Sequence, residues 1–410
     1  MIRIPKPADE TKRSWWRGFL AGALLCLVFF IVFCYVVQPG AITIWKSGGL
    51  SPGEASQVVS KIDLLLHSIE DNYLEEVDTD TLLDGAYHGL VSAMGDQYSR
   101  YYTEEEYEQY QQSSSGQYVG IGVTVKKAEG GGAEITEVAE GGPAEEAGII
   151  AGDILIRADD TDLTSMDLTD IVEVIQGPEG SEVAITYRRG EQENTTAVVR
   201  ATIDEQTVSG EMLESGIGYI RIEGFEGVTT EQFKTALQSL QEQGLEGLIV
   251  DLRDNPGGRV DVVQEVTNEL VPAGIITYTE DKYGNRQVYD ATEEPFLDLP
   301  LVVLVNENSA SAAEIMAGAI QDREVGILVG TTTFGKGIVQ KTMPFTDGTA
   351  VKVTMAKYYT PNGNYIHGIG ITPDIVIELP DGKSLADLTS RDEDLQLQAA
   401  LEALKTEMGQ

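Results

Sequence analysis

The feature that most constrains this chain is an uncharged apolar run from Phe19 to Val37, reading FLAGALLCLVFFIVFCYVV. A run of about 20 apolar residues is long enough to cross a bilayer as one helix. Five basic residues precede the run and polar sequence follows it, so the positive-inside rule places residues 1–18 in the cytoplasm. We therefore predict a single-pass protein of the cell membrane, with a transmembrane helix at 19–37 and its folded part outside the cytoplasm.

A cleaved signal peptide is the competing interpretation of this run. The run is long for a signal peptide, and no convincing small-x-small site precedes Gln38, so an uncleaved anchor is favoured. Both cysteines, Cys26 and Cys34, lie inside the run, and Leu25 before Cys26 does not suit lipoprotein processing. The exported part therefore has no disulfide, no thiolate metal site and no cysteine nucleophile.

Acidity excludes one class of partner. The net charge of -39 would repel a phosphate backbone, so nucleic acid is not expected to bind. Acidic runs such as Glu104–Glu106 lack interleaved His or Cys and show no calcium-loop pattern, so we predict neither a metal nor a cofactor. A length of 410 residues suits two or three folded units rather than one.

Three changes of pattern divide the exported part. Residues 54–112 have apolar positions three and four apart, which predicts a helical arm whose apolar faces need the main body or a second copy of the chain. A linker is expected at Ser113–Gly116. Residues 117–203 contain short β runs and one helical pattern, and the PAEEAG segment followed by GDIL resembles a PDZ domain, a β-sandwich-like fold.

Residues 205–380 alternate strands with helices. The runs at 247–252 and 301–305 are continuously apolar, as in a sheet covered on both faces, so an α/β core is predicted. Sites in such sheets form at the carboxyl ends of the strands. Residues 381–410 form a tail with a polar helix, interpreted as a packing or dimer surface, which makes a homodimer plausible. The fold class is thus multidomain α+β.

The loops after these two strands hold the candidate chemistry. Ser311 lies where a helix begins, so free N–H groups and the helix dipole would favour negative charge beside it. A capping role for Ser309 or Ser311 explains the pattern equally well. In the other loop, Gly257 permits a close backbone approach, and its N–H with that of Ala312 could form a two-donor oxyanion hole. An ordinary tight turn is the alternative for this loop.

No histidine has a recognisable catalytic setting, which leaves Lys336 as the candidate base. Burial would have to favour its neutral form, and Phe334, Ile338 and Val339 could supply the apolar surroundings. If the segment is a strand, Gln340 shares the face of Lys336 and could orient its amine. An exposed lysine and an exposed glutamine are the alternative.

Three segments in this order, DLRDNPGG, ENSASAAEI and TTFGKGIVQK, resemble the carboxyl-terminal processing peptidase (tail-specific protease) family. The resemblance implies a serine endopeptidase with a core like those of ClpP and crotonase. It assigns Ser311 as nucleophile, Lys336 as general base and Gln340 as the residue that positions it. Gly257 and Ala312 would supply the oxyanion amides. Two other interpretations are a catalytically silent PDZ scaffold that binds exposed tails and a crotonase-like acyl-CoA enzyme.

The PDZ-like segment fits a protease that recognises unstructured carboxyl termini. Residues 118–123, YVGIGV, resemble a carboxylate-binding loop followed by an edge strand, so a tail would be held by N–H groups around Gly120, Ile121 and Gly122. Its last side chain would lie against Ile171, Val172 and Ile175. Family members often have an Arg before the Gly-Pro-x-Gly turn, where this chain has Gln176.

Overall fold

A computed structural model describes residues 49–214, 216–292, 296–380 and 382–409. The predicted cytoplasmic tail at 1–18 and the predicted membrane span at 19–37 lie outside these ranges. Within them, no helix combines the length and apolar character needed to span a bilayer. The chain divides into two units, one ending at Ala86 and the other beginning at Tyr87.

The first unit contains helix α2, Pro52–Asn72, and the first half of α3, Thr79–Ser92. A capping box between Ser51 and Glu54 starts α2. The apolar side chains that suggested an amphipathic arm, including Val58 and Leu65, are 45% and 49% exposed. Ile62, Leu66 and Ile69 of the same face are half-buried, so within the described part of the chain this face is only partly covered.

The second unit begins with strand β1, Arg100–Tyr102, and helix α4, Glu104–Ser115. The linker predicted at Ser113–Gly116 is wrong, because the three serines form the last turn of α4. Ser113 and Ser115 donate to carbonyls three residues earlier, and Gly116 ends the helix in the left-handed conformation at φ 70°.

The PDZ-like part is a six-stranded antiparallel sheet in the order β3-β4-β5-β7-β8, with β6 paired to β5 and with β3 at its edge. Helix α6 holds Ile171 and Ile175 in the core of this part. A separate pair of strands, β2 and β9, joins the two ends of the domain. The elements are β2 (Gln117–Gly120), β3 (Val123–Lys127), β4 (Ala133–Val138), α5 (Pro143–Glu146), β5 (Ile154–Ala158), β6 (Thr161–Asp162), α6 (Leu168–Ile175), β7 (Glu182–Arg189), β8 (Gln192–Val199) and β9 (Ala201–Asp204).

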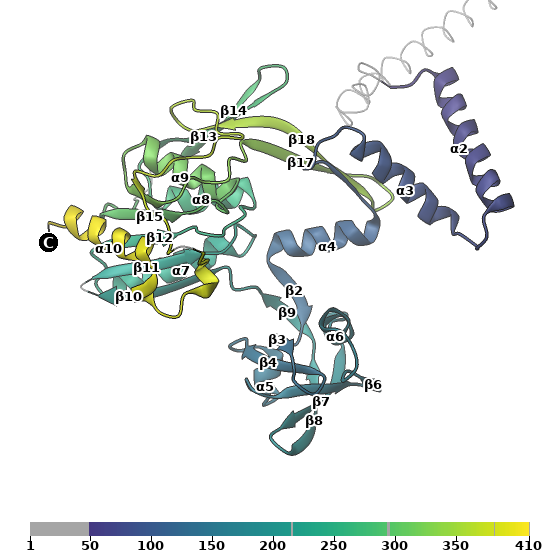
Figure 1. The fold of residues 1–410 in the computed structure, drawn as a ribbon, viewed down its shortest axis with the longest axis horizontal. Helices are drawn as coiled ribbons and strands as arrows, with labels where there is room; N and C mark the ends of the chain where they lie inside the picture. The colour runs from purple at the N-terminus through teal and green to yellow at the C-terminus, as the bar shows by residue number, and fades with distance from the viewer. Residues whose placement is uncertain (1–48, 215, 293–295, 381, 410) are drawn as a thin grey trace, which may run out of the picture. The chain divides into compact units, whose positions relative to one another are not determined.

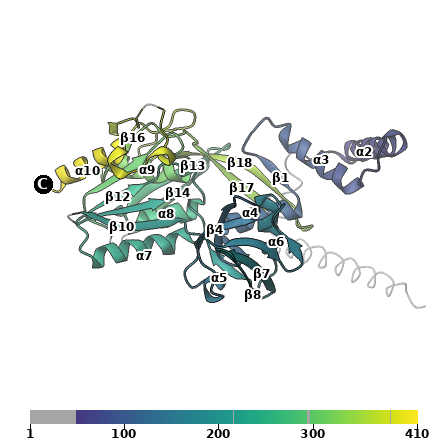
Figure 2. The ribbon, with the colours of Figure 1, turned by 60° about the horizontal axis from the view of Figure 1, so that its bottom comes forward.

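The core is a six-stranded sheet in the order β10-β11-β12-β15-β16-β19, parallel from β11 onward (Figures 1 and 2). The continuous apolar runs are β12 and β15, which lie side by side in its centre. Apolar clusters cover both faces, one with α7, α8 and α9 and the other with α10, so the predicted α/β core is confirmed. The elements are β10 (Val208–Glu214), β11 (Ile217–Ile222), α7 (Thr229–Glu242), β12 (Gly247–Asp251), α8 (Val260–Asn268), β15 (Leu301–Val305), α9 (Ala312–Asp322), β16 (Ile327–Gly330), β19 (Ile375–Val376) and α10 (Leu395–Glu407).

A second, antiparallel sheet includes the long hairpin of β17 and β18, which pairs with β1 (Figure 1). Its strands are β13 (Gly274–Asp281), β14 (Arg286–Ala291), β17 (Ile338–Pro344) and β18 (Ala350–Tyr359). The hairpin begins directly after the segment that contains Lys336. Residues near the start of the second unit therefore pair with the end of the hairpin that is close to its turn, at Ala350–Lys352.

Buried charges attach the C-terminal tail to the core sheet. The Arg253 guanidinium is 2% exposed and donates to both carboxylate oxygens of Asp251, both of Asp394, and Gln396. Burial opposes the charge of Arg253, but the bonds and charges of the two aspartates outweigh it and raise its pKa. Two 3₁₀ turns, Leu385–Asp387 and Arg391–Glu393, precede α10. The tail thus packs on the loop that follows β12.

Candidate active site

Ser311 is the N-cap residue of α9, at the point where the loop after β15 becomes a helix. Its backbone has φ 56° and ψ -110°, a conformation that costs free energy for any residue except glycine and is typical of functional turns. Ser309 has a structural role instead. It is fully buried, donates from its hydroxyl to the carbonyl of Leu252 and accepts from the N–H of Asn306.

The loop after β12 lies against this turn. Gly257 has φ 103°, and a Cβ at this position would come within 2.8 Å of Ser311 Cβ and 2.9 Å of Ala312 N. Only glycine allows this approach, so the close contact predicted for Gly257 is present. Asn255 fixes the loop, because it accepts from the N–H of Ala310 through its carbonyl and donates from its amide to Ile222.

The two predicted oxyanion donors differ in their partners. The N–H of Ala312 makes no hydrogen bond to any other residue that the structure describes. The N–H of Gly257 instead donates to Oδ1 of Asn255 at 2.8 Å. One donor is therefore open, and the other is engaged by a side chain of its own loop.

Lys336 lies in the loop before β17 rather than in a strand. Burial and the neighbouring charge of Lys352 lower the pKa of its amine, and the carboxylate of Glu314 acts in the opposite direction. Phe334 was predicted to contribute to the apolar surroundings of Lys336. Its side chain is 53% exposed, so it does not form a buried environment. Ile338 and Val339 are half-buried, and Val339 packs on the core.

The Lys336 amine faces an aromatic ring. Its Nζ lies 4.9 Å from the ring centroid of Tyr98, within the range of a cation–π contact. No hydrogen bond joins this amine to the Ser311 hydroxyl in the described part of the chain. The candidate nucleophile and the candidate base are thus on neighbouring segments, with no hydrogen bond between their side chains.

Gln340 does not orient Lys336 in this structure. Its amide donates to Oγ1 of Thr354 at 3.4 Å. The predicted alternation fails for two reasons: β17 begins at Ile338, after the lysine, and the pairing register shifts between Val339 and Gln340. The alternation of side chains along a strand therefore does not place Lys336 and Gln340 on the same face.

Sequence reasoning missed Glu314, the residue that holds the two candidate catalytic segments together. Its carboxylate is 0% exposed and accepts from the N–H of Ser311 at 2.9 Å. It also accepts from the Thr333 hydroxyl at 2.6 Å and from the N–H groups of Gly335 and Lys336 at 2.7 and 2.8 Å. The S-x-x-E spacing from Ser311 is a capping-box signal that could have identified it.

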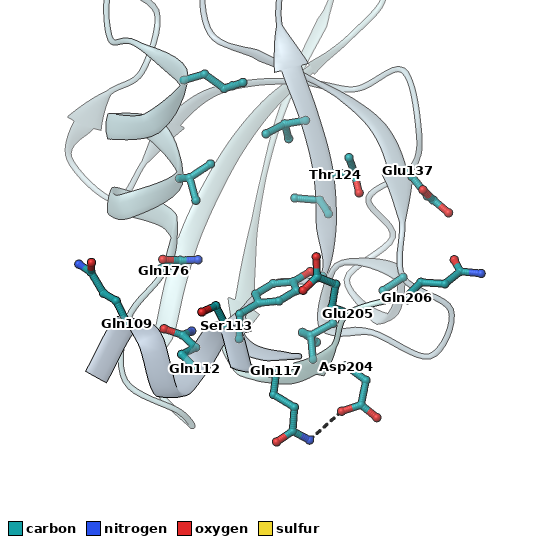
Figure 3. Close-up of a pocket in the computed structure, with 18 residues that line it drawn as sticks. Gln109, Gln112, Ser113, Gln117, Thr124, Glu137, Gln176, Asp204, Glu205 and Gln206 are labelled. Atoms are coloured by element: carbon teal, nitrogen blue, oxygen red, sulfur yellow. Dashed lines mark hydrogen bonds between the residues drawn. The ribbon is translucent and has the colours of Figure 1, made fainter. Parts of the chain in front are cut away.

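The PDZ-like part has a groove lined by residues of β3, α6, α4 and β9 (Figure 3). Val172 and Leu168 of α6 line it, whereas Ile171 and Ile175 belong to the core, so only Val172 of the three predicted contacts faces the groove. Its lining includes the acids Glu137, Asp204 and Glu205 and no lysine or arginine.

The predicted carboxylate loop lies at the end of this groove. Gly120 ends β2, Ile121 is 1% exposed in the core, and Gly122 lines the groove with φ 76°. The N–H groups of Ile121 and Gly122 have no hydrogen-bond partner among the described residues. They are therefore available to an anion, whereas the side chain of Ile121 is structural.

An arginine does lie near Gln176, but it comes from the junction between β8 and β9. Arg200 is 8% exposed and donates to the carbonyls of Ile175 and Val174, at the C-terminal end of α6. Gly177 leaves room for its guanidinium, since a Cβ there would lie 2.9 Å from Arg200 Nε. Arg200 thus supports the helix end, while Gln176 lines the groove.

Three segments of the chain match models of known protein families. The model of peptidase family S41 matches residues 216–377, a PDZ domain model matches 134–189, and the N-terminal domain of the activating protease CtpB matches 46–106. The carboxy-terminal processing protease CtpA of Bacillus subtilis is 36% identical over 86% of this chain and 78% of its own length.

Two further similarities agree with these matches. A probable CtpA-like serine protease of Staphylococcus epidermidis is 32% identical over 93% of this chain and 77% of its own length. The solved structure of a putative S41 protease from Bacteroides fragilis, 18% identical, matches with a TM-score of 0.50 over 82% of this chain and 91% of that one. The last similarity concerns the fold alone.

We expect Glu314→Gln to lower the free energy of unfolding by about 2–4 kcal/mol, because a neutral amide leaves at least one of four buried donors unpaired. Chemical denaturation of the purified protein measures this. Glu242→Gln, on the exposed face of α7, is the control and should change stability little. Equal stability of the two variants would contradict the assigned role of Glu314.

Replacing Lys352 with methionine should move the acid limb of the pH–activity profile to higher pH. The positive charge of Lys352 disfavours the protonated form of Lys336 and lowers its pKa, so removing that charge raises the pKa. Less neutral amine is then present at a given pH, and kcat/KM on the acid side should fall roughly twofold or more. Lys352→Arg keeps the charge and should retain the original profile. A profile unchanged in Lys352→Met would contradict this account.

Proposed function

Because this chain belongs to peptidase family S41, with the carboxy-terminal processing proteases among its relatives, we propose that it is a membrane-anchored endopeptidase with a Ser/Lys mechanism. Its substrates are proteins with unstructured carboxyl termini. The observation that carries this proposal is the buried Glu314 carboxylate, which bonds to the backbone of both Ser311 and Lys336. A shared buried partner keeps the nucleophile and the base at neighbouring positions.

The mechanism follows from the chemistry of these groups. Neutral Lys336 accepts the proton of the Ser311 hydroxyl as the oxygen attacks the scissile carbonyl. The N–H of Ala312, at the amino end of α9, donates to the developing oxyanion, joined by the N–H of Gly257 once it leaves Asn255. Lys336 then protonates the leaving amine, and a water that it deprotonates hydrolyses the acyl-enzyme.

Lys336 suits this role because its environment favours the neutral form. Burial and the charge of Lys352 lower its pKa from the value of an exposed lysine, for which almost no neutral amine exists at neutral pH. Gln340 would join the amine only after releasing Thr354. Productive catalysis thus requires small movements of Lys336, Gln340 and Gly257.

The groove supports recognition of a carboxyl-terminal tail as an added strand on the free edge of β3. Leu168 and Val172 are four residues apart on α6, a rise of about 6 Å, and two residues of a strand span about 6.8 Å. Because these two spacings are similar, Leu168 and Val172 would each contact one of two side chains on the same face of the tail. We therefore propose that tails have apolar side chains at the last and third-from-last positions.

The electrostatics of the groove add a second preference. The terminal carboxylate would accept from the free N–H groups of Ile121 and Gly122 rather than from a basic side chain. Because Glu137, Asp204 and Glu205 line the groove, upstream residues of the tail should be neutral or basic.

The apolar run at 19–37 and the basic residues before it support the membrane anchor and an extracytoplasmic location. The exposed apolar side chains of α2 support contact with a second copy of the chain, as in a homodimer.

The catalytic assignment predicts that Ser311→Ala and Lys336→Ala each lower kcat at least about a thousandfold in the full-length protein purified in detergent. The assay is cleavage of an unstructured fluorogenic peptide ending in valine. The control, Ser309→Ala, should remain active to the extent that it folds. Full activity in either Ser311→Ala or Lys336→Ala would refute the mechanism, and tight tail binding without cleavage by the wild type would favour a binding scaffold.

The groove assignment predicts that Val172→Asp weakens binding of a valine-ended tail at least about tenfold, since it places a carboxylate against an apolar side chain. Fluorescence anisotropy in the Ser311→Ala background measures Kd without cleavage. Glu173→Gln, on the exposed side of α6, is the control and should bind as well as the parent. An equal Kd for Val172→Asp would show that the tail binds elsewhere.

A further inference from the structure

The contact between Lys336 and Tyr98 has no part in the proposed reaction. Tyr98 comes from the loop between α3 and β1, more than 200 residues before Lys336 in the chain. It is half-buried, with its ring centroid 4.9 Å from the lysine Nζ. The face of an aromatic ring attracts a cation, so the ring stabilises the ammonium form and acts against burial and the charge of Lys352, which favour the neutral amine.

The ring is held in place by a compact turn. Asp96 accepts from the N–H of Tyr98 at 3.0 Å through one oxygen and from the hydroxyl of Ser99 at 2.6 Å through the other. Two residues after Tyr98, β1 pairs with β18, with Arg100 opposite Lys352. Tyr98 is therefore fixed between a hydrogen-bonded turn and a strand.

The same turn is connected to Gln340. Ser99 accepts from the N–H of Thr354 at 3.1 Å, and the hydroxyl of Thr354 accepts from the amide of Gln340 at 3.4 Å. One segment, residues 96–99, thus contacts Lys336 through a ring and Gln340 through Thr354. Lys336 and Gln340 are each linked to this segment, and no hydrogen bond joins their side chains in the described part of the chain.

We propose that Tyr98 is a positioning residue that holds Lys336 away from Ser311 and so restrains the protease until the loop at residues 96–99 moves. This inference rests on the proposed Ser/Lys mechanism. For the serine to be activated, the amine has to exchange the ring of Tyr98 for the hydroxyl of Ser311. Removal of the ring makes that exchange easier, whereas removal of the phenol hydroxyl alone does not.

The test compares Tyr98→Leu with Tyr98→Phe in the full-length protein purified in detergent, using the valine-ended fluorogenic peptide. The leucine fills apolar space but has no ring, so kcat should rise about fivefold with little change in KM. The phenylalanine keeps the ring and should behave like the wild type. Tyr365→Leu is the matched control, since it removes a similar contact with Lys357 on the same hairpin, and should leave kcat unchanged.

The possible outcomes separate this inference from the mechanism. A kcat that stays equal or falls in a folded Tyr98→Leu, while Ser311→Ala is inactive, overturns the restraint and leaves the mechanism intact. An equal rise in Tyr98→Phe and Tyr98→Leu overturns it too, because the hydroxyl and not the ring would then be responsible. Full activity of Ser311→Ala would refute the proposed Ser/Lys mechanism itself. Thermal melting of each variant shows that a loss of rate is not a loss of folding.

Discussion

The buried carboxylate of Glu314 is the interaction on which the active site depends. Burying an ionised group without partners costs several kcal/mol, so this side chain is stable only because four donors surround it. Those donors come from the N-cap of α9 and from residues 333–336, two segments that follow the neighbouring parallel strands β15 and β16. The carboxylate thereby fixes the positions of the backbone at Ser311 and Lys336 relative to each other.

Around this fixed backbone, the reactive groups are engaged elsewhere. The amine of Lys336 lies on Tyr98, the amide of Gln340 bonds to Thr354, and the N–H of Gly257 donates to Asn255. Each contact is weak and local, with a net contribution of about 1 kcal/mol. The backbone is fixed, and the side chains can exchange partners at little cost. Such a protease can be held inactive, and its proposed active site can then be assembled without refolding.

The sequence predicted the arrangement of the backbone better than it predicted the side-chain contacts of the candidate site. Continuous apolar runs correctly indicated β12 and β15, and the glycine at position 257 correctly indicated a close approach to the turn at Ser311. Local patterns failed where tertiary contacts decide. The lysine and Gln340 were expected on one strand face, but the strand begins after the lysine and contains a register shift. Ser113–Ser115 looked like a linker because serine is common there, yet their hydroxyls bond within the last turn of α4.

The contacts of two residues could not be predicted from local sequence patterns for a different reason. Tyr98 lies far from the candidate catalytic segments in the chain, and the pairing of β1 with β18 and the bond between Ser99 and Thr354 hold it close to Lys336. Arg200, between β8 and β9, supports the end of α6 close to the place where Gln176 departs from the family pattern. Long-range pairing of this kind has no local sequence signal.

A crystal structure of the protein with a peptide boronate bound covalently to Ser311 would show whether the proposed catalytic groups exchange partners on a fixed backbone. We expect that Lys336 Nζ has left Tyr98 and lies within about 3 Å of the Ser311 oxygen, and that the N–H of Gly257 has turned from Asn255 to the adduct, with Glu314 unmoved. An adduct with Lys336 still over Tyr98, or with the bonds of Glu314 broken, would contradict this expectation.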